Sequence, residues 1–261
     1  VLVATLVGPF RLLLFVPAIV FAWMFSALSV LGWPPKAEEP LPRWRLAIQA
    51  PVPFLWRAWI FSMGYHFIRV KGTPAQRSEA PICVVNHQSF LDAFIMFSMG
   101  RLGTVAKEEV LKIPFCKHVL QAGQTLTVNR TNRQSSSSVL QQIEDRVTSE
   151  KPWPPLFMFP EGTCTNGTAI IAFKKGAFAP GKPVQPITIK YLWGNVDPCK
   201  VYGGGPGIAS IICRLFTTLD SSAEVHFLPV VTPSPEEQAD PMLFSDRVRG
   251  ATVSYTHLTL P

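Results

Sequence analysis

The chain has 261 residues, of which 48% are hydrophobic and 16% charged, and 24 lysines and arginines outnumber 17 aspartates and glutamates to give a net charge of +7. This length can bury one substantial core, while the charged fraction falls below the roughly 25% of an average soluble protein. The positive excess suits anionic lipid surfaces and phosphate-bearing substrates, and we discount nucleic acid as a partner because the basic residues are scattered rather than gathered in a run or an arginine-rich helix.

The first predicted element is an N-terminal apolar segment. Arg11 is the one charged residue between positions 1 and 33, and residues 12–31 are uncharged over a length that can cross a hydrocarbon core. Pro17 would kink such a helix, which a membrane helix tolerates. A cleaved signal peptide is the alternative, although the stretch is long for one and Trp33-Pro34-Pro35 is a poor cleavage site. We therefore expect a membrane helix or a re-entrant hairpin here.

A second apolar segment, residues 46–70, follows a charged and proline-rich break at 36–45. It is rich in tryptophan and phenylalanine but contains Arg57 and His66. That mixture is typical of an interfacial helix in the head-group plane of a membrane. The alternative is a helix packed on the soluble domain. We expect residues 1–70 as a whole to form membrane-anchoring and interfacial helices.

From Lys71 onward the pattern changes to short apolar runs that alternate with amphipathic stretches. Strands are predicted at residues 82–85, 103–106, 125–128, 156–159, 184–191 and 225–231, and helices at 90–99, 111–121, 134–150 and 208–219. Ser234 before Pro235, with Glu237 three positions on, predicts the start of another helix through a capping box. This alternation predicts an α/β fold over residues 71–250, with a mixed, largely parallel sheet flanked by helices.

The last residues, 251–261, differ from the pattern before them. Residues 253–261 look like the translation of a sequencing-library adapter fused to a truncated reading frame. We expect this tail to be non-native and to take no part in the fold, with the natural protein continuing beyond Arg249.

The five cysteines are odd in number and widely spaced, and the sequence contains no Cys-x-x-Cys pair. This pattern argues against a disulfide framework and against a zinc site, and it favours reduced thiols facing the cytosol. Two glycosylation sequons begin at Asn129 and Asn166. Both fall inside segments that we interpret below as catalytic, and we expect neither to be used.

The string Asn86-His87-Gln88-Ser89-Phe90-Leu91-Asp92 places a histidine five residues before a carboxylate. An imidazole oriented by a carboxylate is a general base. Residues five apart on one regular helix point about 140° away from each other. The pair can therefore meet only if His87 lies in the turn after a strand and Asp92 in the first helical turn, where α/β sheets bind ligands. The alternative is a capping box in which Asp92 merely reaches back to Ser89.

A second motif, Phe159-Pro160-Glu161-Gly162-Thr163-Cys164-Thr165-Asn166, follows about seventy residues later. It supplies an acid, a glycine and hydroxyl groups on a turn after an apolar run. Such a turn can hold a polar head group beside a general base. For Glu161 the alternative is a carboxylate that caps a helix.

The two motifs together resemble those of the glycerophospholipid acyltransferases, and the longer string from Phe159 to Asn166 is similar to the lysophosphatidylcholine acyltransferase branch. Further blocks match in order between about residues 62 and 249: 105–109 with 113–115, Gly123 with 128–130, and 183–187. In the family the first of these borders the acyl channel, and the arginine of the second meets the phosphate. Asn86 and Gly167 depart from the residues common in close relatives, which leaves the head-group preference open.

This resemblance implies an acyl-CoA-dependent enzyme that transfers a fatty acyl group to the free hydroxyl of lysophosphatidylcholine or a related lyso-lipid, in phospholipid synthesis and remodelling. His87 is then the general base, and Asp92 fixes its tautomer. The residues implied in substrate binding are Lys107, Arg130, Glu161, Gly162 and Thr163. Arg130 would clamp the phosphate, with a plain surface charge as the alternative. The reaction requires no metal and no cofactor besides acyl-CoA as co-substrate.

The expected location is the membrane of the endoplasmic reticulum, with His87 facing the cytosol, and the expected partners are the two substrates and membrane lipids. Two other functions stay open. A thiol-dependent lipid hydrolase would use Cys164 as nucleophile and His87 as base, but no activating neighbour of this thiol is evident in the sequence. A non-catalytic membrane-binding protein would keep the apolar segments, but it has no need of His87 and Asp92 at this spacing.

Overall fold

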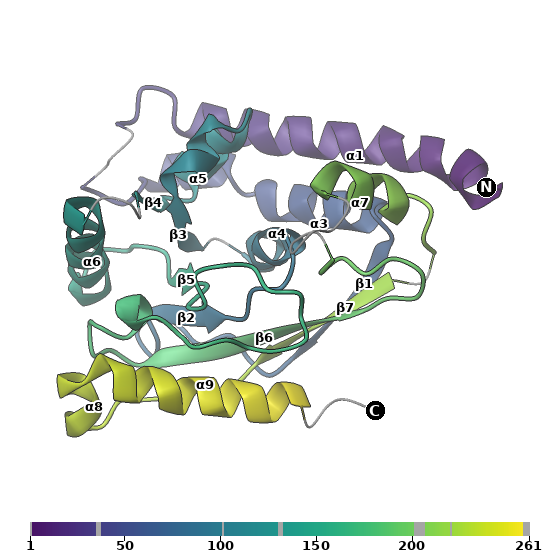
Figure 1. Ribbon diagram of the computed structural model, residues 1–261. Helices are drawn as coiled ribbons and strands as arrows, with labels where there is room; N and C mark the ends of the chain where they lie inside the picture. Colours follow the sequence, from purple (N-terminus) through teal and green to yellow (C-terminus); the bar gives the residue numbers. More distant parts are fainter. Residues whose placement is uncertain are drawn as a thin grey trace.

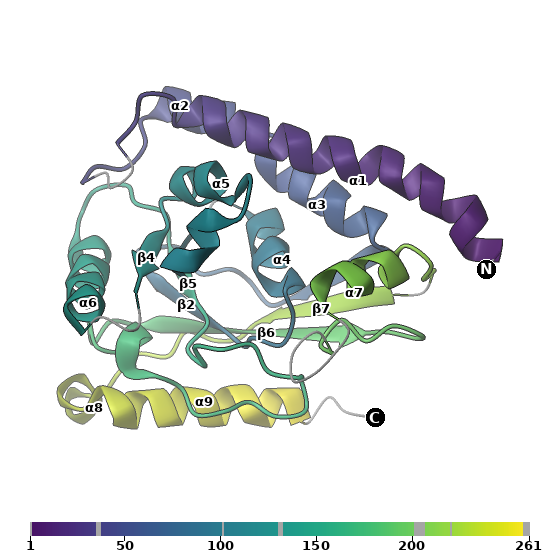
Figure 2. The same ribbon diagram turned by 45° about the horizontal axis from the view of Figure 1, so that its top comes forward.

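The structure is a computed structural model that describes residues 2–34, 38–100, 102–129, 133–200, 207–219 and 221–257. A single twisted sheet runs through it, with α1, α3, α4 and α7 on one face and α8 and α9 on the other (Figures 1 and 2). Their bounds are Leu2–Ser29 for α1, Val52–Ser62 for α3, Leu91–Met99 for α4, Ile208–Leu215 for α7, Pro235–Ala239 for α8 and Pro241–His257 for α9. The remaining helices are α2 (Arg43–Ile48), α5 (Cys116–Ala122) and α6 (Arg133–Thr148).

The sheet has the strand order β1-β7-β6-β2-β5-β3-β4. The strands are β1 Tyr65–Lys71, β2 Ile82–Val85, β3 Gly103–Lys107, β4 Leu126–Val128, β5 Leu156–Met158, β6 Val184–Leu192 and β7 Ser221–Phe227. β6 and β7 pair antiparallel, and the other neighbouring strands pair parallel. The mixed, largely parallel sheet flanked by helices that the sequence predicted is therefore confirmed.

The central strand β2 shows why its sequence is uniformly apolar. Side chains alternate between the two faces of a strand, and both faces of this one are covered by helices. Ile82 and Val84 join the hydrophobic cluster with α6 and α9, whereas Cys83 and Val85 join the cluster with α1, α3 and α4. Burial of such side chains contributes about 1.5 to 3 kcal/mol for each large one. The strand is thereby fixed, and with it the start of the loop that follows.

Of two helices predicted from the sequence, one is present in the structure and the other is divided. The helix predicted at 134–150 is α6, and its expected inner face of Val139, Ile143 and Val147 is buried. The helix predicted at 111–121 is instead divided into a 3₁₀ turn, Glu108–Lys112, and α5. Pro114 explains the division, because proline disfavours the helical conformation in the residue before it.

The N-terminal segment forms one continuous helix rather than a hairpin. Within α1, residues Val7–Ser29 are long and apolar enough to cross a membrane by length and composition, with a mean hydropathy of 2.2. One side of this helix is nevertheless packed on the rest of the chain, where Ala18 and Ala22 are buried and the rings of Phe15 and Trp59 lie 5.3 Å apart. Its other side is exposed, with Phe10 74% and Leu13 73% accessible.

The structure differs from the interfacial helix expected over residues 46–70. Helix α3 buries Trp56 and Trp59 against Phe94 of α4, with ring centroids 4.9 and 4.6 Å apart, so it is packed on the domain as the alternative proposed. After it, Tyr65–Lys71 is an edge strand parallel to β7. Its aromatic and β-branched residues favour a strand once a neighbouring strand is available, and that neighbour lies about 155 residues further along the chain.

The C-terminal part of the chain begins as the sequence predicted. The Ser234 side chain accepts the backbone N–H of Glu237, and the Glu237 carboxylate accepts the N–H of Ser234, which is the expected capping box of α8. Residues 251–257 continue α9, with Thr252 buried, although we expected the tail to stay outside the fold. Residues 258–261 lie outside the described residues. The non-native origin of the tail stays a prediction.

Candidate active site

The loop between β2 and α4 is tied to the neighbouring strand β6. The buried Asn86 side chain donates to the carbonyl of Ile189 at 3.0 Å and accepts the N–H of Ile189 at 2.7 Å. Gln88 donates to the same carbonyl at 2.5 Å. These bonds fix the residues on both sides of His87, so the histidine occupies a defined place at the carboxyl end of β2.

His87 and Asp92 meet as their spacing predicted, with His87 in the turn and Asp92 in the first turn of α4. The distance between His87 Nδ1 and Asp92 Oδ2 is 2.9 Å. Asp92 is fully buried, and its Oδ2 also accepts the backbone N–H groups of Gln88 and Ser89 at 2.7 and 2.8 Å. The carboxylate thus holds the turn and the imidazole at once. The capping contacts of the alternative form as well, because the Ser89 N–H donates to Asp92 and the Ser89 hydroxyl accepts the N–H of Leu91 at 3.3 Å. One carboxylate therefore caps the start of α4 and holds the histidine.

Tyr191 completes the surroundings of Asp92 and was not identified from the sequence. Its hydroxyl, on β6, donates to Asp92 Oδ1 at 2.6 Å. Burial, followed by the nearby Asp92 charge, raises the pKa of Tyr191 far above its usual value, so the hydroxyl stays a donor. A buried carboxylate is costly unless it is hydrogen-bonded, and this one receives bonds at both oxygens. The only signal in the sequence was a tyrosine in a buried strand, 99 residues from its partner.

Glu161 joins the second motif to the first. It is 1% exposed, its Oε1 accepts the backbone N–H of His87 at 2.7 Å, and its Oε2 accepts that of Ile171 at 3.2 Å. Burial raises the pKa of Glu161, while the two N–H groups act in the opposite direction. Both oxygens therefore contact the protein backbone rather than cap a helix, and the acceptor-binding role that the resemblance implied stays a prediction. In this structure Glu161 positions the His87 loop.

Two other residues of the second motif hold His87 in place. Thr165 donates to the His87 carbonyl through its N–H at 2.8 Å and its hydroxyl at 3.1 Å. The Phe159 ring stacks on the imidazole, with centroids 4.0 Å apart and planes 15° apart. The His87 side chain remains 22% exposed, and among the described residues no hydrogen bond to its Nε2 is found. That nitrogen is available to take a proton.

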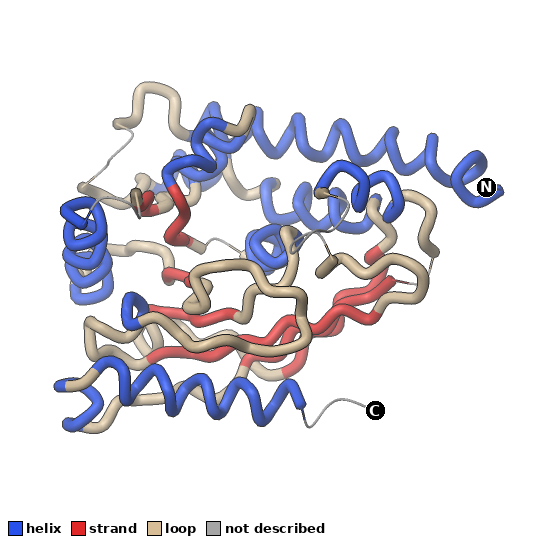
Figure 3. The backbone as a smooth tube through the Cα atoms, in the orientation of Figure 1, coloured by secondary structure: helices blue, strands red, loops and turns tan. Residues whose placement is uncertain are grey.

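Gly162 and Thr163 lie on the turn after Glu161. Gly162 has a φ of +70°, and a Cβ built there would come 2.8 Å from the Lys174 ammonium nitrogen. Glycine therefore permits both the turn and the close passage of Lys174, a cation that the sequence interpretation did not single out. Thr163 is exposed beside it. Figure 3 shows the connection between β5 and β6, which contains these residues, as mostly loop.

The two remaining predicted residues are less closely tied to the site. Lys107 is the exposed last residue of β3, which is separated from β2 by β5 and ends at the same edge of the sheet. Arg130 lies outside the described residues.

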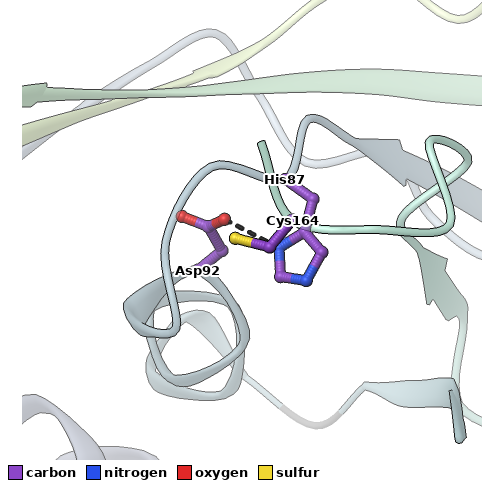
Figure 4. A group of neighbouring side chains, drawn as sticks. All are labelled: His87, Asp92 and Cys164. Carbon is purple, nitrogen blue, oxygen red and sulfur yellow. Dashed lines mark hydrogen bonds and ion pairs between the residues drawn. The ribbon is translucent and has the colours of Figure 1, made fainter. Parts of the chain in front are cut away.

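Cys164 lies beside the histidine and the aspartate. One ligand atom from each of His87, Asp92 and Cys164 falls within 4.8 Å of the others. Figure 4 shows the sulfur next to the line that joins the Asp92 carboxylate to the imidazole. The structure thus gives this thiol two ionisable neighbours that the sequence did not reveal, because the segment that follows β5 returns across the His87 loop.

Known proteins that resemble this chain are acyltransferases. A family model described as Acyltransferase matches residues 67–190. Lysophosphatidylcholine acyltransferase 1 of Danio rerio is 38% identical over 92% of this chain and 46% of its own length. Lysophosphatidylcholine acyltransferase 2 of Homo sapiens is 37% identical over 95% of this chain and 46% of its own. The chain thus spans about half the length of these curated relatives.

The fold also matches a solved structure. The 1-acyl-sn-glycerophosphate (LPA) acyltransferase PlsC from Thermotoga maritima aligns with a TM-score of 0.56 and 18% identity, covering 96% of this chain and 99% of that one. At 18% identity this match supports the fold and carries no information about function. The family model and the curated relatives confirm the resemblance found in the two motifs. The chain contains an Acyltransferase family domain at residues 67–190, and lysophosphatidylcholine acyltransferases are among the proteins that it resembles.

Proposed function

We propose that this protein is an acyl-CoA-dependent acyltransferase that transfers a fatty acyl group to the free hydroxyl of a lysophospholipid, lysophosphatidylcholine or a related lyso-lipid. The observation that carries the proposal is the His87–Asp92 pair, in which a fully buried carboxylate holds Nδ1 at 2.9 Å and leaves Nε2 without a protein partner among the described residues. The names of the relatives supply the substrate class.

In this reaction the acceptor hydroxyl attacks the thioester carbonyl carbon of acyl-CoA. His87 Nε2 takes the hydroxyl proton as the new C–O bond forms, and the C–S bond then breaks to release coenzyme A, whose sulfur receives the proton back from the imidazolium. Asp92 holds the Nδ1–H and stabilises the imidazolium. A base positioned in this way contributes about 10²- to 10⁴-fold in rate. All atoms are conserved, and no residue of the chain becomes acylated.

The acceptor phosphate needs cationic partners near His87. Lys174 is a cation whose ammonium group passes close to Gly162, and the exposed Thr163 adds a hydroxyl on the same turn. We assign phosphate binding to these groups together with Arg130, and we keep Lys107 as a residue of the acyl-CoA side. Glu161 and Thr165 act indirectly, because they hold the backbone of His87.

Membrane contact is proposed for the outer face of α1. The inner face of this helix is packed on α3 and α5, so the apolar side chains on its exposed side, Phe10 and Leu13 among them, are the ones left for lipid. The membrane is proposed to be that of the endoplasmic reticulum, with His87 on the cytosolic side. All five cysteines are thiols rather than disulfides, which suits that side.

The experiment for the function is an assay of acyl transfer from radiolabelled acyl-CoA in membranes, with a panel of lysophospholipids that differ in head group. We expect time-dependent formation of diacyl phospholipid with at least one acceptor, and a rate about 10²- to 10⁴-fold lower in the His87→Ala protein. Release of free fatty acid without acceptor acylation would contradict the proposal.

A second candidate function follows from the position of Cys164. A thiol within 4.8 Å of the catalytic pair could attack the acyl group itself and form an acyl-enzyme. Cys164→Ala separates the two cases: direct transfer predicts substantial remaining activity, whereas a nucleophilic thiol predicts loss of activity together with acyl groups trapped on Cys164 in the wild type.

Membrane attachment has its own test. Leu13→Glu places a charge on the outer face of α1 and should release the protein from lipid vesicles at moderate salt, without loss of helical structure. Met242→Glu is the matched control, because Met242 is exposed on α9, across the sheet. Equal release of both variants would count against α1 as the lipid-facing element.

A further inference from the structure

His87, Asp92 and Cys164 offer the donor set of a zinc site. Imidazole, carboxylate and thiolate are all zinc ligands, and an open zinc site has three protein ligands and one water. The spacing of the cysteines in the sequence did not indicate this site, because the three donors come from the loop after β2, the first turn of α4 and the segment after β5, which meet only in the fold. Their ligand atoms lie within 4.8 Å of one another.

The donors need only a small adjustment to surround one ion. In a tetrahedral zinc site, ligand atoms are about 3.3 to 3.6 Å apart, so separations of at most 4.8 Å must close by no more than about 1.5 Å. Cys164 lies half-buried in a segment without regular secondary structure, which allows its side chain to move. His87 and Asp92 already lie at 2.9 Å and would open slightly as the ion replaces the proton between them.

The residues behind the donors are also suited to hold an ion. Metal ligands are normally oriented by a second layer of hydrogen bonds. Here Asp92 is held by two backbone N–H groups and by the Tyr191 hydroxyl, and the His87 backbone is held by Glu161 and Thr165. The side chain of His87 is 22% exposed, which leaves the fourth position open to water.

We propose that His87, Asp92 and Cys164 bind one thiophilic divalent cation, with Zn²⁺ as the preferred ion, and that the bound ion inhibits the enzyme. Binding at Nε2 occupies the base directly. Binding at Nδ1 forces the remaining ring proton of a neutral imidazole onto Nε2, which then has no lone pair for the acceptor proton. Mg²⁺ and Ca²⁺ prefer sites made of oxygen atoms and do not compete. The inhibition rests on the proposed function, whereas the binding does not.

Binding is tested by titrating the purified full chain in detergent micelles with Co²⁺, a spectroscopic substitute for Zn²⁺. We expect one equivalent to give a thiolate-to-cobalt absorption band and the visible bands of a tetrahedral ion, both removed by Zn²⁺. Cys164→Ser, Cys164→Ala and His87→Ala should each lose the thiolate band, while Cys116→Ser and Cys213→Ser keep it. A wild-type protein without the band, or a band that survives in both Cys164 variants, overturns the site.

Inhibition is tested in the acyl transfer assay. Zn²⁺ should inhibit the wild type reversibly, with recovery on chelation, and Cys164→Ser should raise the half-inhibitory concentration at least tenfold. Mg²⁺ at the same concentrations should not inhibit. Equal Zn²⁺ sensitivity of wild type and Cys164→Ser overturns the inference. A protein that binds Co²⁺ but transfers no acyl group would refute the proposed function and support the metal site. An active protein without the thiolate band would refute the metal site and support the proposed function.

Discussion

Two histidine–carboxylate pairs in this molecule differ in what surrounds the carboxylate. In the first, His87 Nδ1 lies 2.9 Å from the fully buried Asp92, whose further partners are backbone N–H groups and the Tyr191 hydroxyl. In the second, on β7, His226 Nε2 lies 3.3 Å from Glu224. That carboxylate is shared with Arg69 at 3.5 Å and Lys71 at 3.7 Å, both on the neighbouring strand.

The two histidines differ as much as their acids. His226 is almost fully buried, and its second nitrogen contacts the Tyr255 hydroxyl at 2.7 Å, so both ring nitrogens have protein partners. His87 is partly exposed and keeps Nε2 open among the described residues. A carboxylate beside a histidine is therefore not sufficient for a base. Glu224 and His226 belong to a cluster of charged side chains on β7 and β1. Asp92 instead accepts hydrogen bonds from uncharged donors, and its partner His87 has an accessible nitrogen.

Among substitutions in the two histidine–carboxylate pairs, His87→Ala is expected to reduce the rate of acyl transfer most. Loss of the base should reduce acyl transfer by about 10²- to 10⁴-fold, while the thermal unfolding temperature changes little because the side chain is partly exposed. His226→Ala is the matched control and should keep activity within about twofold. Turnover measured with saturating acyl-CoA, alongside circular dichroism melting, checks both. More than a tenth of wild-type activity in His87→Ala would remove its assignment as base.

Asp92→Asn should have the second largest effect, a loss of about 10- to 100-fold. The N–H groups of Gln88 and Ser89 require an oxygen at the Oδ2 position, so the amide should keep its carbonyl towards His87 and preserve the tautomer. What is lost is the negative charge that stabilises the imidazolium. Glu224→Gln, the matched change in the other pair, should leave kcat unchanged. An equal loss of kcat in the two variants would contradict the distinction between the pairs.

Tyr191→Phe should reduce kcat by about three- to tenfold and leave both KM values unchanged. The substitution removes one of the hydrogen bonds to a buried carboxylate, at a cost of about 1 to 3 kcal/mol in stability, without altering any group that touches substrate. Tyr255→Phe removes the corresponding hydroxyl from His226 and should not affect turnover. A rise in KM with unchanged kcat in Tyr191→Phe would show that this tyrosine does not position the base.

The smallest effect expected is a pH-dependent change in stability from Glu224→Gln. Burial opposes ionisation of Glu224, but His226, Lys71 and Arg69 outweigh it and lower the pKa of this carboxyl. A lowered pKa contributes stability above the unfolded value of about 4.3, and this contribution is lost as the pH falls through the folded value. The wild type should therefore melt above the variant at pH 7, by less than about 1 kcal/mol, and the gap should close on acidification. A gap that does not change with pH would contradict the ion cluster.

Much of this molecule follows from short stretches of its sequence. The apolar run of β2, the four-residue spacing of Val139, Ile143 and Val147, and the capping box at Ser234 each predict their element, because helix and strand periods and caps involve only neighbouring residues. The five-residue spacing of His87 and Asp92 likewise required a turn followed by a helix, and the structure has both.

Only the tertiary structure decided which distant residues reach this pair. Tyr191 reaches Asp92 because β6 lies next to β2, and Glu161 and Cys164 reach the His87 loop because the connection after β5 returns across it. Residues 65–71 became a strand through pairing with β7, and α1 buries one face because α3 and α5 lie beneath it. Strand order and helix packing depend on the free energy of burying surfaces far apart in the chain, and local propensity contains no information about them.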